Sequence, residues 1–157
     1  MFIRLLKCLS PLALVSVIFS HAAFAQDDGV IRVKSAYSMQ ETLARLKQDV
    51  AAKGIMFFSE VDQQALAAKA GITIRPSTLL MFGNPPLGTL FISAKPEAGL
   101  DWPVRLLVQQ DEKGGVWAIY SDFDWIARRH GISGDAVKPF QTASGVITSI
   151  TSSIKAN

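Results

Sequence analysis

Residues 104–121, VRLLVQQ-DEKGG-VWAIYS, constrain the architecture more than any other segment of the chain. Val104–Gln110 and Val116–Ser121 are rich in β-branched, aromatic and other apolar residues, as strands are. Five residues separate them, and the glycines Gly114 and Gly115 permit the positive backbone angles that a tight connection needs. The segment therefore predicts two antiparallel strands joined in a hairpin.

Toward the N-terminus, residues 30–35 have an alternating pattern that is rich in valine and isoleucine, and this pattern predicts a strand. Ser38 and Glu41 then match a capping box, in which the two side chains satisfy amides at the start of a helix. Apolar residues follow at spacings of four, three and four, which places them on one helical stripe, and Gly54 ends the helix. The stripe consists of Met39, Leu43, Leu46 and Val50.

The middle of the chain predicts two more strands. Ile55–Val61 is apolar and aromatic, and Asp62 follows it as the natural N-cap of a short alanine-rich helix, Gln63–Ala70. Ser77–Phe82 has the same strand composition and ends at a Gly-Asn-Pro-Pro stop. Together with the first strand and the hairpin, these segments predict about five strands.

The remaining segments predict helices and one loop. Prolines after Asn84 suit a first helical turn, so residues 87–94 are expected to form a short helix or an ordered loop, and residues 95–103 a loop. Residues 122–129 predict a short helix, and a longer terminal helix carries Phe140, Ala143, Ile147, Ile150 and Ile154 on one stripe. The fold class expected is α+β: one antiparallel sheet with helices packed on one face.

The N-terminus has the pattern of a secretory signal peptide. Arg4 and Lys7 precede an apolar stretch, and Ala23-Phe24-Ala25 offers the small residues of a cleavage site. The apolar stretch is shorter than the ~20 residues that cross a bilayer. We therefore expect residues 1–25 to be removed on export to the periplasm, leaving residues 26–157 as a single domain without stable membrane insertion.

Removal of residues 1–25 would take away the sole cysteine and two basic residues, leaving 14 basic and 13 acidic residues and a net charge of +1. No run of lysine or arginine marks a surface that follows phosphates, so nucleic acid is not an expected partner. Without cysteine, disulfides, thiol chemistry and thiolate zinc sites are excluded from such a domain. No standard catalytic motif occurs, and no cofactor is expected.

The end of the third strand is the candidate ligand site. Gly83 and Asn84 stand where a strand passes into a helix start, and free amides at such a start can hold an anion or a carbonyl oxygen. The alternative is that Asn84 only caps the helix. Thr89 follows nearby, and Trp102, in the loop before Pro103, could line a pocket or an interface. Ligand binding is predicted here.

His130 is the one histidine of residues 26–157 and a further candidate. With a carboxylate such as Asp101 or Asp122 it could perform acid–base chemistry. The alternative is a histidine that only complements a helix C-terminus, whose replacement by alanine leaves the fold nearly intact. A single histidine without cysteine gives no recognised zinc spacing, so no metal is predicted.

Several motifs resemble the bacterial domain of unknown function 302 family. They are Phe82-Gly83-Asn84-Pro85, Gly88-Thr89, Asp101-Trp102-Pro103, Val116-Trp117 with Tyr120, and Arg128-Arg129-His130-Gly131. The resemblance covers Val33 to about Ile132. It implies a TATA-binding-protein-like fold and a homodimer, but no established activity. Many members have a histidine after the aspartate that begins the second helix, whereas Gln63 follows Asp62 here, and Trp102-Pro103 replaces Leu-Pro.

Three functional hypotheses follow from these residues. The leading one is an exported module that binds a small molecule or a protein partner near Asn84. The second is an enzyme of unrecognised type that uses His130 with a carboxylate. The third is a structural dimer of the cell envelope. A pocket joining Asn84, Thr89 and Trp102 would favour the first, and a cleft joining His130 to Asp101 or Asp122 would favour the second.

Overall fold

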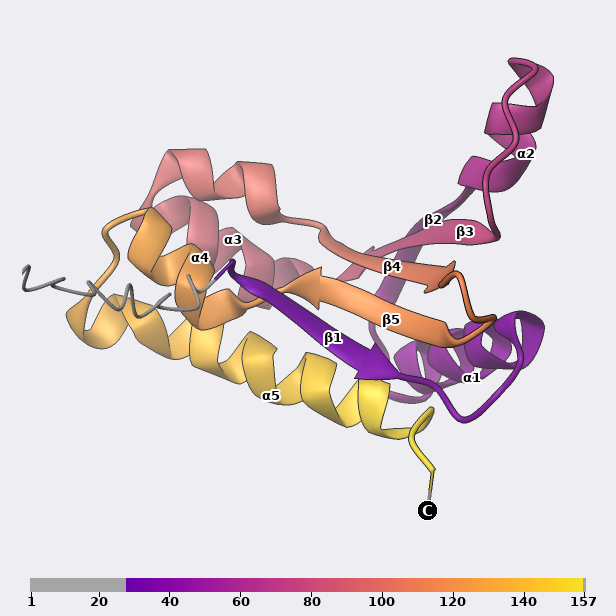
Figure 1. The fold of residues 1–157 in the computed structure, drawn as a ribbon. Helices are drawn as coiled ribbons and strands as arrows, with labels where there is room; N and C mark the ends of the chain where they lie inside the picture. The colour runs from indigo at the N-terminus through magenta and orange to yellow at the C-terminus, as the bar shows by residue number, and fades with distance from the viewer. Residues whose placement is uncertain (1–27, 157) are drawn as a thin grey trace, which may run out of the picture.

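Five strands form one antiparallel sheet in the order β1-β5-β4-β3-β2 (Figure 1). The structure, a computed structural model, describes residues 28–156, so the expected signal peptide lies outside the described residues. The strands are β1 (Val30–Lys34), β2 (Met56–Asp62), β3 (Ser77–Gly83), β4 (Val104–Gln110) and β5 (Val116–Ser121). The predicted α+β class with a five-stranded antiparallel sheet is confirmed.

The hairpin of β4 and β5 forms as the sequence predicts, with Leu106 opposite Tyr120 and Gln110 opposite Val116. Its turn is organised by the carboxylate of Asp111. Oδ1 accepts the Gly115 amide at 2.8 Å, and Oδ2 accepts the Trp117 indole N–H at 2.7 Å. These hydrogen bonds, the indole one foremost, hold the pKa of Asp111 below its ordinary value.

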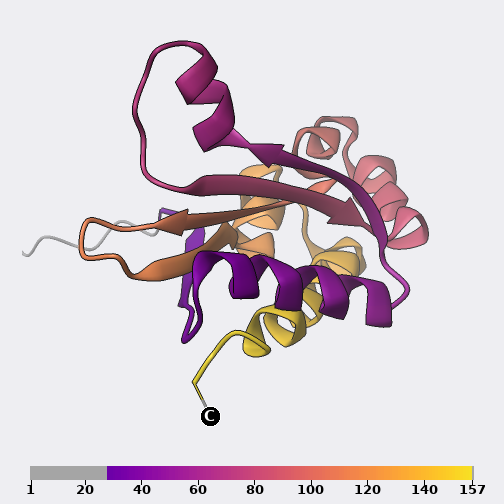
Figure 2. The same ribbon diagram turned by 90° about the vertical axis from the view of Figure 1, so that its right-hand side faces the viewer.

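The helices are gathered mainly on one side of the sheet (Figures 1 and 2). Strand positions facing them are buried, as Leu80, Leu106 and Ala118 show at 0% exposure. Their neighbours on the opposite face, such as Leu107, are only half-buried. The helices are α1 (Met39–Ala52), α2 (Gln63–Lys69), α3 (Pro85–Ala94), α4 (Phe123–Arg129) and α5 (Lys138–Ser152), with 3-10 helices η1 (Pro96–Asp101) and η2 (Gly134–Val137).

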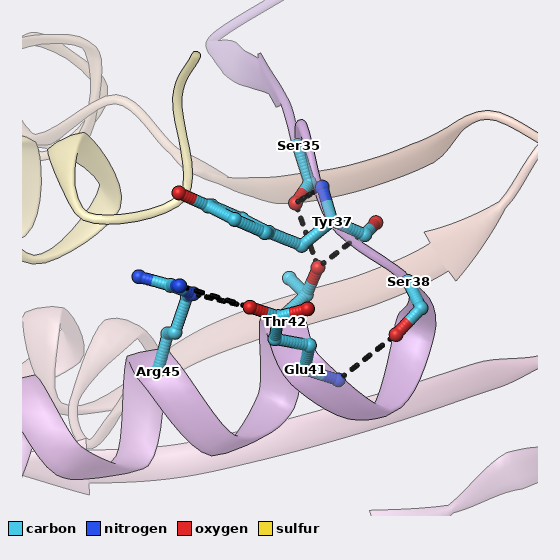
Figure 3. A network of polar contacts seen from close by, with 6 residues as sticks. All are labelled: Ser35, Tyr37, Ser38, Glu41, Thr42 and Arg45. Carbon is cyan, nitrogen blue, oxygen red and sulfur yellow. Dashed lines mark hydrogen bonds and ion pairs between the residues drawn. The ribbon is translucent and has the colours of Figure 1, made fainter. Parts of the chain in front are cut away.

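A small buried polar network fixes the start of α1 against the end of β1 (Figure 3). The Ser35 and Thr42 hydroxyls lie 2.7 Å apart, and both residues are at least 92% buried. Ser35 Oγ also accepts the Tyr37 amide at 3.1 Å. Since a buried hydroxyl without a partner is costly, this pair explains how two polar residues are tolerated at the core.

The cap of α1 is half of the predicted capping box. Ser38 Oγ accepts the Glu41 amide at 3.3 Å, as expected. The Glu41 carboxylate accepts instead from Arg45, at 2.9 Å, one helical turn later (Figure 3). An i,i+4 ion pair on the helix surface thus replaces the second capping bond.

Two segments differ from the sequence predictions. The expected loop at residues 95–103 contains η1, which begins at Pro96, a residue whose fixed φ suits a first helical position. The expected short helix after Asn84 begins two residues earlier, at Pro85. α2 projects from the end of the sheet (Figure 2), and none of its residues is buried.

Candidate functional site

The site region begins where β3 passes into α3. Asn84 is the N-cap: its Oδ1 accepts the Leu87 amide at 3.2 Å, and its carbonyl accepts the Gly88 amide at 2.8 Å. Pro85 and Pro86 have no amide hydrogen. The first turn of α3 therefore offers no free amide to an anion, which corrects the sequence argument for ligand binding through this helix start. Capping is the role that the geometry gives to Asn84 Oδ1.

Trp102 is seated against two glycines of this same region. A Cβ added at Gly83 would lie 2.7 Å from the indole Nε1, and one added at Gly88 would overlap the indole. Phe58 meets the Trp102 ring edge-on, with ring centroids 5.8 Å apart. The peptide bond between Trp102 and Pro103 is cis. Both glycines are thus required by the close approach of the indole.

Behind Trp102 lies a cavity of about 240 Å³, which we call the Trp102 cavity. It lies among the ends of α1 and β3, the helix α3 and one face of α5. Most of its lining is apolar. The lining residues are Lys53, Ile55, Phe82, Gly83, Asn84, Leu87, Gly88, Phe91, Trp102, Val104, Ala143, Val146 and Ile147.

Three of the five predicted site residues meet at the Trp102 cavity: Gly83, Asn84 and Trp102. Thr89 is not part of its lining. The Thr89 hydroxyl donates to the Pro85 carbonyl at 2.9 Å, a common arrangement of threonine within a helix. The structure therefore brings the predicted asparagine and tryptophan together and leaves the threonine on the exposed side of α3.

His130, the fifth predicted residue, belongs to a separate cluster. Its Nε2 lies 2.7 Å from Asp101 Oδ2, and the two side chains are 7% and 4% exposed. Asp101 Oδ1 accepts from Arg129 at 3.4 Å, and Arg105 lies 3.7 Å from the same oxygen. A buried carboxylate thus has one histidine within hydrogen-bond distance and two arginines close to it, and buried carboxylates are usually paired in this way. The adjoining cavity is about 10 Å³, room for roughly one water.

Asp122, the other predicted partner of His130, caps α4 through a 2.9 Å bond from the Asp124 amide to its Oδ1. Within residues 28–156, no three side chains of the His, Cys, Asp and Glu types converge as metal ligands would. Of the two predicted carboxylates, Asp101 therefore lies against His130 and Asp122 does not, and the cavity that Asp101 lines is about 10 Å³.

Sequence reasoning missed most of the cavity wall, including Lys53 at the end of α1 and the α5 residues Ala143 and Val146. One signal was present in the sequence. Gly88 occupies the interior of a helix, where glycine costs about 1 kcal/mol relative to alanine, and such a glycine indicates close packing.

A groove of about 530 Å³ lies between β1 and α5 and is larger than the Trp102 cavity. Its lining is mainly charged or hydroxylated, with Arg32, Lys34, Ser144, Thr148 and Lys155 among its residues. Its walls are therefore less apolar than those of the Trp102 cavity, and small ligands are usually buried against mainly apolar walls. We treat the Trp102 cavity as the candidate site for that reason.

The family model described as domain of unknown function DUF302 matches residues 31–150. A crystal structure of an uncharacterised conserved DUF302 protein from Bacillus stearothermophilus is similar in fold, with a TM-score of 0.74 and 14% identity. The similarity covers 82% of this chain and 99% of that one.

Curated relatives are found in Brucella. A protein of Brucella suis named fluoride-specific ion channel FluC 1 is 38% identical over 125 residues, covering 78% of this chain and 49% of the relative. A protein of Brucella abortus with the same name is also 38% identical over 125 residues, which is 46% of its length. This chain thus spans about half the length of the curated relatives that it matches. In residues 28–156, no helix is both long and apolar enough to span a membrane.

Proposed function

We propose that this chain, which belongs to the DUF302 family, is an exported binding module. It holds a small, mainly apolar molecule in the Trp102 cavity. The observation that carries this proposal is the cavity itself: about 240 Å³ of space with apolar walls and a few polar side chains at its lining. Ligand sites have this combination, in which apolar walls supply affinity and isolated polar groups supply orientation.

The first test is native mass spectrometry of the full-length chain, expressed in a bacterial host and purified without added ligand. We expect a reproducible extra mass that is lost on unfolding. The intact mass also tests export, because cleavage after Ala25 removes the first 25 residues, whereas an uncleaved chain in the cytoplasm contradicts a periplasmic location.

The second test uses octan-1-ol, a neutral apolar probe, and the intrinsic fluorescence of the protein. We expect a saturable change in emission that the Trp102→Phe variant loses, because Trp102 lines the cavity. Val146→Phe adds a ring to a residue of the cavity wall and should abolish the response. Leu90→Phe is the matched control, since Leu90 is 47% exposed and not part of the lining. The absence of both a retained mass and a saturable response would contradict the proposal.

The enzymatic hypothesis has weaker support. The 2.7 Å contact between His130 and Asp101 is compatible with acid–base chemistry. However, three cationic or donor side chains already surround Asp101, and a substrate would need more than the ~10 Å³ of space beside it. These contacts favour a structural role for the cluster.

The names of the Brucella relatives support a second candidate function. In those proteins, the region similar to this chain shares a polypeptide with the rest of a protein named fluoride-specific ion channel. We infer that this chain acts beside such a channel, in fluoride tolerance. Deletion of its gene should reduce growth in fluoride but not in equal chloride, and equal growth in both salts contradicts this role.

A further inference from the structure

The polar side chains around the Trp102 cavity are donors of hydrogen bonds. Lys53 carries an ammonium group and Trp102 an indole N–H, and neither side chain can accept. Asn84 has one acceptor oxygen, but Oδ1 already accepts the Leu87 amide, which leaves the two N–H groups of its side chain for another partner. Most hydrogen-bonding groups of this set are therefore donors, and a ligand with acceptor atoms complements them.

The charge of the lining has one sign. Of the residues that line the cavity, Lys53 alone is charged, and no aspartate or glutamate is among them. Its nearest carboxylate is on Asp49, with Nζ and Oδ2 4.0 Å apart, and both side chains are about one third exposed. A pair at that distance neutralises the ammonium group weakly. The cavity therefore presents an ammonium charge that is available to a negatively charged ligand.

The volume limits the size of the ligand. A cavity of about 150 Å³ lined by apolar side chains holds benzene, which has six heavy atoms. On the same scale, the 240 Å³ of the Trp102 cavity suits a ligand of about ten heavy atoms. Leu87 and Val146, which line the cavity and are only half-buried, provide apolar surface for most of them.

We propose that the ligand is a small monoanionic amphiphile, with an apolar body of about eight carbons and a single carboxylate. Its carboxylate contacts Lys53 and the Asn84 amide, and its apolar body packs against Leu87 and Val146. This inference rests on the proposed function, since it names the ligand class of the same cavity.

Three probes with eight carbons each and different head groups test the inference: octanoate, octan-1-ol and octylamine, titrated at equal pH and ionic strength. Octanoate should bind at least about tenfold tighter than octan-1-ol, because a hydrogen bond to a charged group is worth that much. Octylamine should bind most weakly. Lys53 is also the C-cap residue of α1, and the carbonyls at that helix end favour cations. Weak binding of octylamine is therefore a stringent test, because the helix end by itself would attract the amine.

Variants of Lys53 test whether this side chain causes the preference for octanoate. Lys53→Gln should weaken octanoate about tenfold and octan-1-ol less than about twofold, and Lys53→Arg should retain the octanoate preference. Lys69→Gln is the matched control, because Lys69 is an exposed lysine of α2 that does not line the cavity. Lys69→Gln changes the net charge of the protein by the same amount as Lys53→Gln and should leave the affinities for all three probes unchanged. Thermal unfolding of each variant confirms that the fold persists.

The outcomes separate the inference from the proposed function. If octanoate and octan-1-ol bind equally, or if Lys53→Gln weakens both alike, the cavity is apolar in its preference and the carboxylate assignment is wrong. If octylamine binds tightest, the site favours a cation and the assignment is again wrong. If none of the three binds, the proposed function fails as well.

Discussion

Gly88 shows how one residue shapes the candidate site. In a helix interior, alanine is more favourable than glycine by about 1 kcal/mol, but a Cβ at this position would overlap the Trp102 indole. We predict that Gly88→Ala lowers the free energy of unfolding by about 1 kcal/mol or more, because overpacking costs about 1–3 kcal/mol. Urea unfolding measures this. In a Trp102→Leu background the same substitution should become stabilising, and stabilisation in the wild-type background would mean that the indole lies elsewhere.

Asp111 gives a prediction about pH at the same scale. Its folded pKa lies below its ordinary value because the Trp117 indole and the Gly115 amide donate to the carboxylate. Its contribution to stability is therefore present above the unfolded pKa of about 3.9 and is lost as the pH falls through the folded value. Asp111→Asn should be less stable than wild type at pH 7, with the difference narrowing below about pH 4. A difference in melting temperature that stays constant from pH 7 to pH 3 would contradict this.

At the scale of elements, the contact between His130 and Asp101 joins the C-cap of α4 to the end of η1, one residue before Trp102. Sequence reasoning expected His130→Ala to leave the fold nearly intact, but the structure shows a side chain only 7% exposed and bonded to a buried carboxylate. We now predict a loss of about 1–3 kcal/mol in denaturant unfolding, the cost of depriving a buried group of a partner. Gln141→Ala, on the exposed side of α5, is the control. A loss below about 0.5 kcal/mol would mean that the arginines suffice for Asp101.

The elements themselves were largely predictable, because each rests on local signals. The hairpin at residues 104–121 depends on two glycines and two apolar runs, and the caps at Ser38, Asp62 and Asn84 are each made by the predicted side chain. The cavity was not predictable to the same degree. Its wall joins residues as distant as Lys53 and Val146, and no local pattern of the sequence specifies how α1 and α5 meet at the end of β3.

At the scale of the whole molecule, the sheet has two unlike faces. One is covered by α1 and α5, as Figure 1 shows. On the other, a row of apolar residues crosses neighbouring strands, with Leu79 opposite Leu107 and Leu107 opposite Ile119. These side chains are half-buried rather than buried. An apolar sheet face of this kind is where a second copy of the chain would pack if the chain forms the homodimer that the family resemblance implies.

The homodimer stays a prediction, and Leu107 offers the sharpest test of it. Leu107 lies on β4, the middle strand of the sheet, so a two-fold interface over the apolar face places it near the centre, where a buried charge is most costly. We predict a dimer in sedimentation velocity and a monomer for Leu107→Glu. Ile72→Glu, at a residue 58% exposed beside α2, should remain dimeric. A monomeric wild type at tens of micromolar would exclude a stable dimer. A dimer that survives Leu107→Glu would place the interface elsewhere on the molecule, because two buried carboxylates that face each other across the two-fold axis could not both stay ionised.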